Sequence, residues 1–464
     1  MRTVKIISFL LISTFSLAAF TLPGPSAASQ PLKTPTPRGL DPNGPWIIMH
    51  DSESLMVSNA DGTGLEQLFG GMGIHGVSLS PNSRTIAVIL DDSPTDDSKG
   101  LSLALYRLPE GEKKITLPLQ NPAQLPGDGL DSEPHRAITM GSPRWSHDGK
   151  TVAFIGQMDG RSADLYLYEV ETGTISRLST EDTQAYQPSW SPDDRYVFFA
   201  TAKAFGTGAG YWNAGSWFIR RDGKQIFPTI SKDKSDHVIT WVDSSMAVLA
   251  ESGIVCGTMN IRLFNLNTQK SYSVWPDYVK DVAYSEANGQ LALFIPQDFE
   301  GCTEGKQPTG LYFLEIKSGN LREIYTPYTT GMKLDPSTGR DYLLRNDIVL
   351  SRMDAAGNRQ FIDNTRKSDP EYSEAAGLWL WYKRPELYEG IWVGKLEEKP
   401  RQVYEHPIGE TTMTPGGKSI YFMELGIGRL HRADAPDFNP VPIVTSDKLK
   451  DWTLVIYADP GNPS

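Results

Sequence analysis

Short apolar runs bounded by turn-forming residues dominate the pattern of the chain. In the clearest unit a strand ends at Trp145, a Ser-His-Asp-Gly turn follows, and a second apolar strand covers 151–154. The next unit repeats this order with Trp190, a Ser-Pro-Asp-Asp turn and an apolar strand over 196–199. Because apolar runs of this length between Gly, Pro, Asp and Ser are typical of buried strands, the pattern predicts an all-β protein in which helices are nearly absent.

The large residue before the turn can be traced eight times along the chain. Successive copies lie 38 to 66 residues apart, an interval centred on the length of a four-stranded propeller blade. The copies are Leu79, Trp145, Trp190, Trp241, Tyr284, Leu334, Tyr372 and Met413. A third and a fourth strand follow in each unit, joined by Thr-Gly or Asp-Gly turns that accept a positive φ easily. Since one such sheet cannot bury both faces alone, the units are expected to stack as blades of a single β-propeller.

Eight copies predict eight blades, with seven as the alternative if one weak copy is an insertion. The strands at 46–49 and 54–57 lack a first strand, and the strand at 452–457 lacks followers. These strands could meet in one closing blade, which would give nine units, a large number for this fold. We therefore expect eight blades within a propeller over 46–458, followed by a tail over 459–464.

The Pro-x-Trp-Ser-Pro-Asp-Gly-like turn and its Val-Ala-Phe strand resemble the repeat of TolB-type propellers. The two best copies cover 143–154 and 188–199, and the segment 59–68 is similar to the end of such a repeat. The same repeat occurs in the propeller of prolyl-oligopeptidase-like peptidases. The resemblance covers roughly 46–432 and implies a TolB-like (PD40, WD40-like) propeller. No counterpart of TolB's α/β domain or of the peptidases' α/β-hydrolase domain is recognised in the sequence.

The first residues predict a signal peptide rather than part of the fold. Two basic residues precede an apolar run over 6–20, and Ser-Ala-Ala at 26–28 fits the small-x-small pattern before a cleavage point. The run is shorter than the roughly 20 residues of a transmembrane helix, although an uncleaved anchor is the alternative. We expect a signal peptide over 1–28 and export to the periplasm or the cell exterior. Five prolines over 29–45 then predict an extended tether.

The charge of the chain excludes one class of partner. The formal net charge is −12, and the excess of Asp and Glu is spread along the chain. Such a protein is repelled by nucleic acid and by anionic membranes, and no basic stripe interleaved with aromatic residues is present. The sequence therefore predicts no nucleic-acid partner, no stable membrane insertion after cleavage, and a monomer.

Catalytic and metal-binding signatures are absent from the sequence. It has no Gly-x-Ser-x-Gly elbow, no His-Glu-x-x-His and no P-loop. The glycine-rich stretch 206–210 is not followed by a helical pattern that would hold a phosphate, and the acidic stretch 91–97 lacks an EF-hand pattern. The seven histidines show no local metal-ligand spacing. We expect no catalytic residue, no metal and no cofactor.

Topology predicts which face carries a binding site. If the Ser-Pro-Asp-Gly turns join the first and second strands on one face, the second-to-third and blade-to-blade connections lie on the opposite, long-loop face. Function concentrates on such loops above a rigid scaffold. The long loops are 119–141, 179–187, 201–215, 296–310 and 383–390. The candidate ligand-binding residues are His135, Arg136, Tyr186, Tyr211, Trp212, Tyr328 and Tyr388, with local packing as the alternative for each.

Two function classes remain open. The first is an exported, non-catalytic module that binds a protein, peptide or glycan. The second is a propeller-type polysaccharide lyase or hydrolase, since oligogalacturonate lyase uses a TolB-like ring. The missing motifs favour the binding module, although His, Gln and Arg around a metal at a central pocket would favour the enzyme.

The two cysteines, Cys256 and Cys302, are predicted to form a disulfide. Both fall between the second and third strands of adjacent repeats, and export would place them where disulfides persist. The bridge would close a loop of 46 residues, for which chain entropy gives at most about 4 kcal/mol. Thiol titration of the unreduced, denatured protein should therefore find no reactive thiol, whereas two per chain would exclude the bridge.

Overall fold

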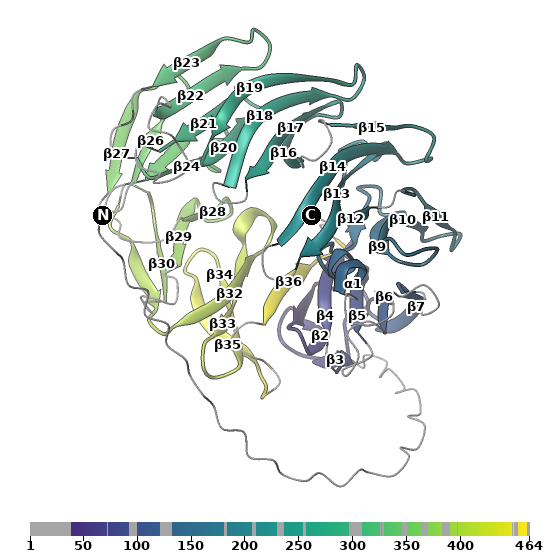
Figure 1. The fold of residues 1–464 in the computed structure, drawn as a ribbon. Coiled ribbons are helices and arrows are strands. Elements are labelled where there is room, and N and C mark those ends of the chain that lie inside the picture. Colours follow the sequence, from purple (N-terminus) through teal and green to yellow (C-terminus); the bar gives the residue numbers. More distant parts are fainter. Residues whose placement is uncertain are drawn as a thin grey trace, which may run out of the picture. The chain divides into compact units, whose positions relative to one another are not determined.

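The described residues of the computed structural model contain nine four-stranded antiparallel sheets (Figure 1). The ranges described are 39–71, 73–91, 100–120, 132–180, 183–206, 210–229, 236–253, 257–296, 309–324, 326, 329–345, 350–363, 370–382, 390–396, 398–447, 449 and 453–461. The predicted signal peptide lies outside them. We number eight sheets as blades 1 to 8 in chain order and call the ninth the closing blade.

Blades 1 to 4 are formed by consecutive strands. Blade 1 contains β4 (Ile74–Leu79), β5 (Thr85–Asp91), β6 (Leu101–Arg107) and β7 (Glu112–Pro118). Blade 2 contains β8 (Arg144–Trp145), β9 (Thr151–Gly156), β10 (Asp164–Glu169) and β11 (Ile175–Arg177). Blade 3 contains β12 (Gln184–Trp190), β13 (Tyr196–Gly206), β14 (Gly210–Arg220) and β15 (Ile226–Pro228). Blade 4 contains β16 (Asp236–Asp243), β17 (Met246–Gly253), β18 (Gly257–Asn265) and β19 (Lys270–Tyr278).

Blades 5 to 8 follow the same order. Blade 5 contains β20 (Asp281–Ser285), β21 (Gln290–Ile295), β22 (Gly310–Glu315) and β23 (Leu321–Ile324). Blade 6 contains β24 (Gly331–Leu334), β25 (Tyr342–Arg345), β26 (Leu350–Met353) and β27 (Arg359–Asp363). Blade 7 contains β28 (Glu371–Ser373), β29 (Leu378–Tyr382), β30 (Ile391–Gly394) and β31 (Arg401–Tyr404). Blade 8 contains β32 (Ile408–Met413), β33 (Ser419–Glu424), β34 (Arg429–Asp434) and β35 (Asn439–Thr445), with a 3-10 turn η1 (Pro415–Gly417) between its first two strands.

The closing blade combines both ends of the described chain. Its order is β36 (Leu454–Ala458), β1 (Trp46–His50), β2 (Ser54–Asn59) and β3 (Glu66–Gly70). The strand β36 pairs antiparallel with β1, with Ile456 opposite Ile48. The expected count of eight blades, or seven, is therefore wrong, because the described residues form nine. The ninth unit carries no turn signature, since its first and second strands come from opposite ends of the chain.

The turn signature has a hydrogen-bonding explanation. The eight large residues all lie in the first strands of blades 1 to 8, as expected. After Trp145, the Ser146 hydroxyl donates to Asp148 Oδ1 (2.6 Å) and accepts from the Thr151 backbone N–H (3.0 Å). The Ser191 hydroxyl makes the equivalent bonds in blade 3. A Ser followed two residues later by Asp therefore closes the turn and starts the second strand.

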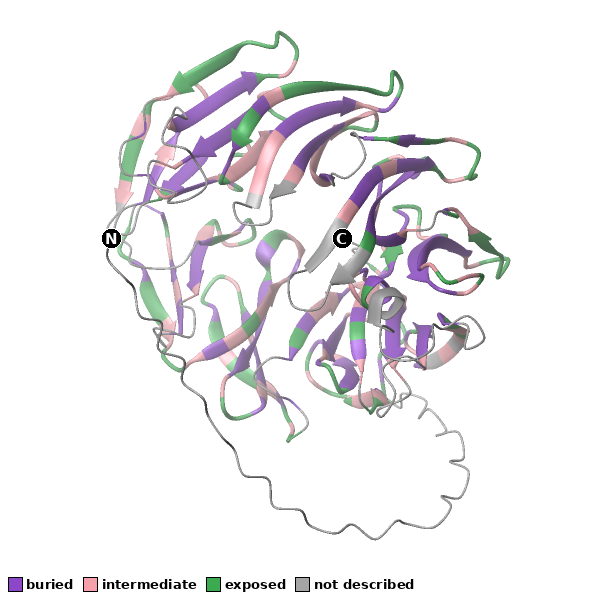
Figure 2. Ribbon diagram, viewed as in Figure 1, coloured by how far each residue is buried: buried purple, intermediate pink, exposed green. Residues whose placement is uncertain are grey.

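The hydrophobic core lies between the blades. Every apolar cluster joins neighbouring blades, including the closing blade, which packs on blade 1 through Ile48 and Ile86 and on blade 8 through Met49 and Met423. Figure 2 shows buried residues along the inner strands and exposed residues along the outer ones. Because both sheet faces are covered, the second strands read as continuous apolar runs rather than alternating ones.

Several loops expected on the long-loop face are partly regular, and the loop 179–187 ends inside β12, which begins at Gln184. Within 119–141 lies an α-helix, α1 (Ser132–Thr139), one of few helical segments in the described residues. The predicted loop 201–215 is wrong, because β13 and β14 continue through it as a long hairpin with Phe205 opposite Tyr211. Gly206 and Gly210 end and begin these two strands, and their glycine-rich surroundings in the sequence are typical of a flexible loop. No described helix is long and apolar enough to cross a membrane.

Closure by β36 predicts a sharp response to truncation. Ending the chain after residue 451 removes a paired strand that buries Val455 and Ala458 and exposes the edge of β1. Burial of a valine-sized side chain contributes about 1.5–3 kcal/mol, and 1 kcal/mol shifts the Tm of a chain of this size by about 1 °C. We therefore expect the Tm to fall by at least about 2 °C. A control that ends after residue 461 should melt like the full chain. Equal melting of both truncations, measured by circular dichroism, would contradict the closing role.

Candidate functional site

The structure places only some of the predicted site residues. Arg136 is exposed on α1, the helix that also carries His135. Tyr186 lies in β12 and is 1% exposed, with its hydroxyl 3.2 Å from Asn213 Oδ1, which matches the packing alternative. Tyr211 and Trp212 lie in β14. The side chains of His135, Tyr211 and Trp212 fall outside the described part of the structure, as do Tyr328 and Tyr388 entirely.

The two cysteines also lie outside the described residues. Cys256 belongs to the connection between β17 and β18, and Cys302 to the connection between β21 and β22. These are second-to-third connections of blades 4 and 5, which are neighbours, as the disulfide hypothesis requires. The bridge stays a prediction.

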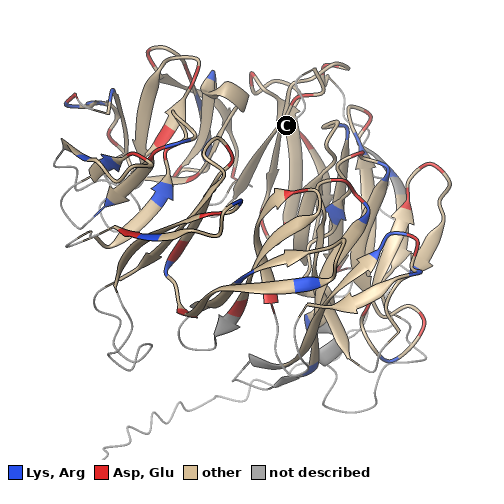
Figure 3. Cartoon of the chain, turned by 90° about the horizontal axis from the view of Figure 1, so that it is seen from above, with Lys and Arg blue, Asp and Glu red and all other residues tan. Residues whose placement is uncertain are grey.

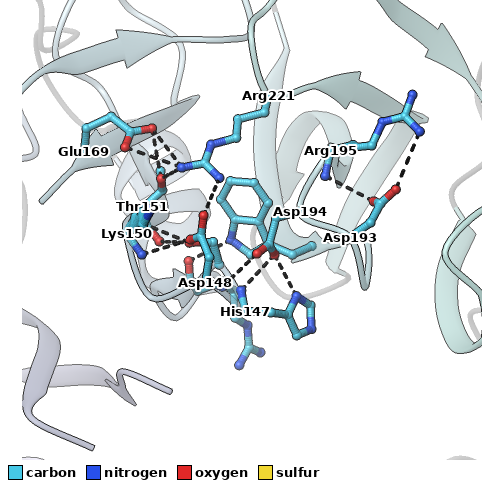
Figure 4. A network of polar contacts seen from close by, with 12 residues as sticks. His147, Asp148, Lys150, Thr151, Glu169, Asp193, Asp194, Arg195 and Arg221 are labelled. Atoms are coloured by element: carbon cyan, nitrogen blue, oxygen red, sulfur yellow. Dashed lines mark hydrogen bonds and ion pairs between the residues drawn. The ribbon is translucent and has the colours of Figure 1, made fainter. Parts of the chain in front are cut away.

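A polar network joins blades 2 and 3 (Figure 4). It lies on the face that carries the Ser-Pro-Asp-Gly turns, which we call the turn face. The Asp194 carboxylate accepts hydrogen bonds from the backbone N–H groups of His147 (2.7 Å) and Asp148 (2.8 Å), and His147 Nδ1 lies 2.7 Å from it. Asp194 has φ 57°, in the left-handed region that Asp tolerates. It occupies the position where the neighbouring turn has Gly149. This carboxylate therefore fastens one Ser-Pro-Asp-Gly turn to the next.

Arg221 strengthens the same junction. Its guanidinium contacts the carboxylates of Asp148 and Glu169, each at 3.1 Å, and lies over the Trp190 ring at 5.6 Å. It also donates to the Thr151 hydroxyl. Because these groups satisfy one another across the blade boundary, we interpret the network as a structural clamp rather than a ligand site.

An inner pocket of about 410 Å³ opens between the first strands of blades 4, 5 and 6. Lys280 and Asp281, at the start of β20, and Lys333 in β24 supply its charged groups. Its apolar wall includes Val282 and Leu334. First strands begin where one blade connects to the next, so this pocket lies on the long-loop side of the first strands.

The charged groups of the inner pocket are held by contacts with the adjacent blade. Lys280 Nζ donates to the Thr330 carbonyl (2.6 Å), and Asp281 Oδ2 accepts from the Met332 backbone N–H (2.8 Å). Lys333 Nζ donates to the Pro370 carbonyl (2.7 Å). The arrangement fixes two ammonium groups and one carboxylate around an apolar wall, which suits a ligand with an apolar body and polar ends.

A cluster of polar side chains is buried at the long-loop end of blade 8. Glu424, at the end of β33, and His431, in β34, are 4% and 5% exposed. His431 Nε2 lies 2.8 Å from Glu424 Oε2, and Arg429 donates to the same oxygen at 3.2 Å. The Tyr404 hydroxyl, from blade 7, lies 3.4 Å from His431 Nε2. The side chains thus form a compact Glu–His–Tyr cluster.

Burial sets the protonation of this cluster. It lowers the pKa of His431 despite the nearby Glu424 carboxylate and raises the pKa of Tyr404. Burial opposes ionisation of Glu424, but hydrogen bonds from His431 and Tyr404 leave its pKa below the usual value. At neutral pH the cluster therefore contains a carboxylate beside a neutral imidazole.

The sequence did not identify the charged residues of the inner pocket or Glu424. In a propeller, groups that meet come from different blades, so local spacing carries no signal for them. Their only common feature is position, at the start of a first strand or the end of a second strand. Among the described residues, no group of three or more His, Cys, Asp or Glu side chains could hold a metal ion.

Comparisons with known proteins identify short sequence matches. No family model matches the chain. Over 55 residues, 12% of this chain, it is 40% identical to the uncharacterized peptidase YuxL of Bacillus subtilis. Over 82 residues, 18% of this chain, it is 29% identical to the uncharacterized protein Atu1656 of Agrobacterium fabrum. These matches cover only 8% and 25% of the two relatives.

Solved structures show the fold. A eukaryotic initiation factor shares 13% identity at TM-score 0.53, over 82% of this chain and 90% of that chain. Dipeptidyl peptidase 4 of Porphyromonas gingivalis shares 12% sequence identity at TM-score 0.51, over 81% of this chain and 60% of that chain. TolB from Acinetobacter baumannii is also similar, with 14% identity and TM-score 0.31 over 61% and 66%. The all-β propeller of four-stranded antiparallel blades that the sequence predicts is confirmed by the nine sheets of the described residues.

Buried histidines predict acid sensitivity. Burial lowers the pKa values of His50, His237 and His431 below 6.5 in the folded chain. The unfolded chain then binds more protons just below pH 6.5, so the free energy of unfolding should decrease as the pH falls through that range. We expect the Tm to drop between pH 7.5 and 5.5, and to drop less in His431→Gln. An identical pH dependence of the two proteins would contradict this role of His431.

Proposed function

We propose that the protein is an exported, non-catalytic scaffold that binds a protein, peptide or glycan on its long-loop face. The inner pocket is the observation that carries the proposal. It lies on that side of the first strands and combines an apolar wall with Lys280, Asp281 and Lys333. Export is supported by the basic start, the apolar run and the Ser-Ala-Ala site of the sequence.

Rigidity supports binding at this pocket. The ammonium groups of Lys280 and Lys333 and the carboxylate of Asp281 are each anchored to a backbone group of the next blade. Side chains fixed before binding lose less conformational freedom when a ligand arrives. The pocket would therefore select ligands by the placement of their polar groups.

A propeller-type polysaccharide lyase or hydrolase is the alternative, and the Glu424–His431–Tyr404 cluster favours it. Buried groups with shifted pKa values gather at catalytic sites, although ion-pair networks also produce them. The cluster lies at the same long-loop ends of the strands as the proposed binding face. If the protein is an enzyme, Glu424→Gln should abolish turnover of an oligosaccharide substrate.

A ligand screen with site variants tests the binding proposal. The mature protein is screened by thermal shift against peptide and glycan panels, because a ligand at 100 times its Kd stabilises by about 2.7 kcal/mol. For the ligand found, Lys280→Ala should weaken binding at least fivefold with the Tm nearly unchanged. Lys317→Ala, an exposed lysine of the same blade in a turn on the opposite face, should bind normally.

The double variant Tyr211→Ala, Trp212→Ala extends the test to the hairpin of blade 3. We expect weaker binding with a nearly unchanged Tm. If the double variant unfolds, these two side chains belong to the core. If neither this variant nor Lys280→Ala affects binding, the long-loop face is not the binding surface.

A further inference from the structure

A large cleft lies on the other face of the propeller, where the Ser-Pro-Asp-Gly turns are. It has a volume of about 850 Å³ and opens between blade 8 and the closing blade. We call it the seam cleft, lined on the blade 8 side by Lys418, Tyr421, Arg432 and Asp434 and on the closing-blade side by Tyr457 and Asp459.

Strand register explains why the interface is open at this end. Tyr421 of β33 lies opposite Arg432 of β34, and the next pair on the same sheet face is Ser419 opposite Asp434. Further along this face, Met423 and Leu430 pack against the closing blade in an apolar cluster. The interface is therefore filled by apolar side chains at one end and lined by polar ones at the other.

The blade 8 wall carries two cationic groups. Arg432 Nε donates to Asp434 Oδ1 (2.8 Å), which also accepts from the Ser419 hydroxyl (2.6 Å), and the guanidinium lies 6.0 Å from the Tyr421 ring centroid. These contacts orient Arg432, whose side chain is 33% exposed. Lys418 is exposed, and no described acidic side chain pairs with it. Lys418 and Arg432 can therefore both contact a ligand. Because Arg432 is already oriented, it loses little conformational entropy when the ligand binds.

The closing-blade wall is acidic and aromatic. Asp459 accepts hydrogen bonds from the Gly461 backbone N–H (2.9 Å) and the Tyr457 hydroxyl (3.2 Å). The Tyr457 ring stacks on Tyr421 with centroids 5.8 Å apart. Burial raises the pKa of Tyr457, so its hydroxyl is neutral near pH 7. The only charge of this wall among the lining residues is thus the Asp459 carboxylate, opposite Lys418 and Arg432.

We propose that the seam cleft is a second binding site, which takes a short peptide segment that carries both an acidic and a basic side chain. An anion alone would face the Asp459 carboxylate, and a cation alone would face Lys418 and Arg432, whereas a segment with both charges meets both walls. Proline and alanine side chains in the lining offer apolar contact between these charges. The volume falls within the 300–1,000 Å³ typical of sites for small ligands, enough for a few residues.

Charge placement distinguishes this cleft from the general surface. Figure 3 shows acidic and basic residues interspersed over the turns and strand ends rather than gathered on one side. The net charge of the chain is −12, so the grouping of Lys418 and the Arg432–Asp434 pair with Asp459 around one cleft is a local feature and not part of a charged field. Complementary charges of this kind favour specificity and register over raw affinity.

A random seven-residue peptide library displayed on phage tests the proposal with the full chain. Selection on the wild-type protein should enrich peptides that contain both an acidic and a basic residue. Their affinity is then measured by fluorescence polarisation for three proteins: wild type, Lys418→Glu and Lys270→Glu. Lys270 is an exposed lysine at the start of β19 in blade 4, so the control makes the same charge change away from the cleft.

The expected result is that Lys418→Glu raises the Kd at least tenfold and Lys270→Glu changes it less than twofold. Replacing the acidic residue of the peptide by Lys should restore binding to Lys418→Glu. The proposal is overturned if no peptide is enriched, or if none of the enriched peptides depends on Lys418. Because Lys418 is exposed and lies on the turn face, neither result depends on the long-loop face or on loss of folding.

Discussion

The pairing of β36 with β1 is the constraint on which the propeller depends. A strand from the C-terminal end supplies the first strand of a blade whose other three strands come from the N-terminal end. Without that pairing, the blade that closes the ring would lose its first strand, whose Val455 and Tyr457 belong to the apolar cluster that covers Met423 of blade 8. The two ends of the chain therefore complete the burial that all the other blades share.

Most of the fold could be predicted because local chemistry repeats with it. Each Ser-Asp turn is closed by its own side chains, as at Ser146 and Ser191, and leaves a trace in the sequence. The ninth blade could not be counted in this way, since its first two strands are not joined by a turn. The hairpin of β13 and β14 was not predicted either, because its glycines gave that segment the composition of a loop.

The sites were harder to predict because they form between blades. Lys280, Lys333 and Thr258 come together in the inner pocket although up to 75 residues separate them in sequence. Tyr421 and Tyr457 likewise meet across the seam between blade 8 and the closing blade. Tyr186 was predicted as a binding residue because it is an aromatic residue of a predicted loop. Its burial in β12 shows that such a residue can equally well be part of the core.

Closure of the ninth blade can be measured directly by amide hydrogen exchange with peptide-level mass spectrometry. Amides paired within a sheet exchange only when the structure opens, whereas an unpaired terminal strand exchanges at once. The account predicts that 454–458 and 46–50 exchange slowly and together, at rates like those of the second strands of other blades. Rapid exchange of the amides of 454–458 would contradict a propeller closed by its two chain ends, whatever the exchange rate of 46–50.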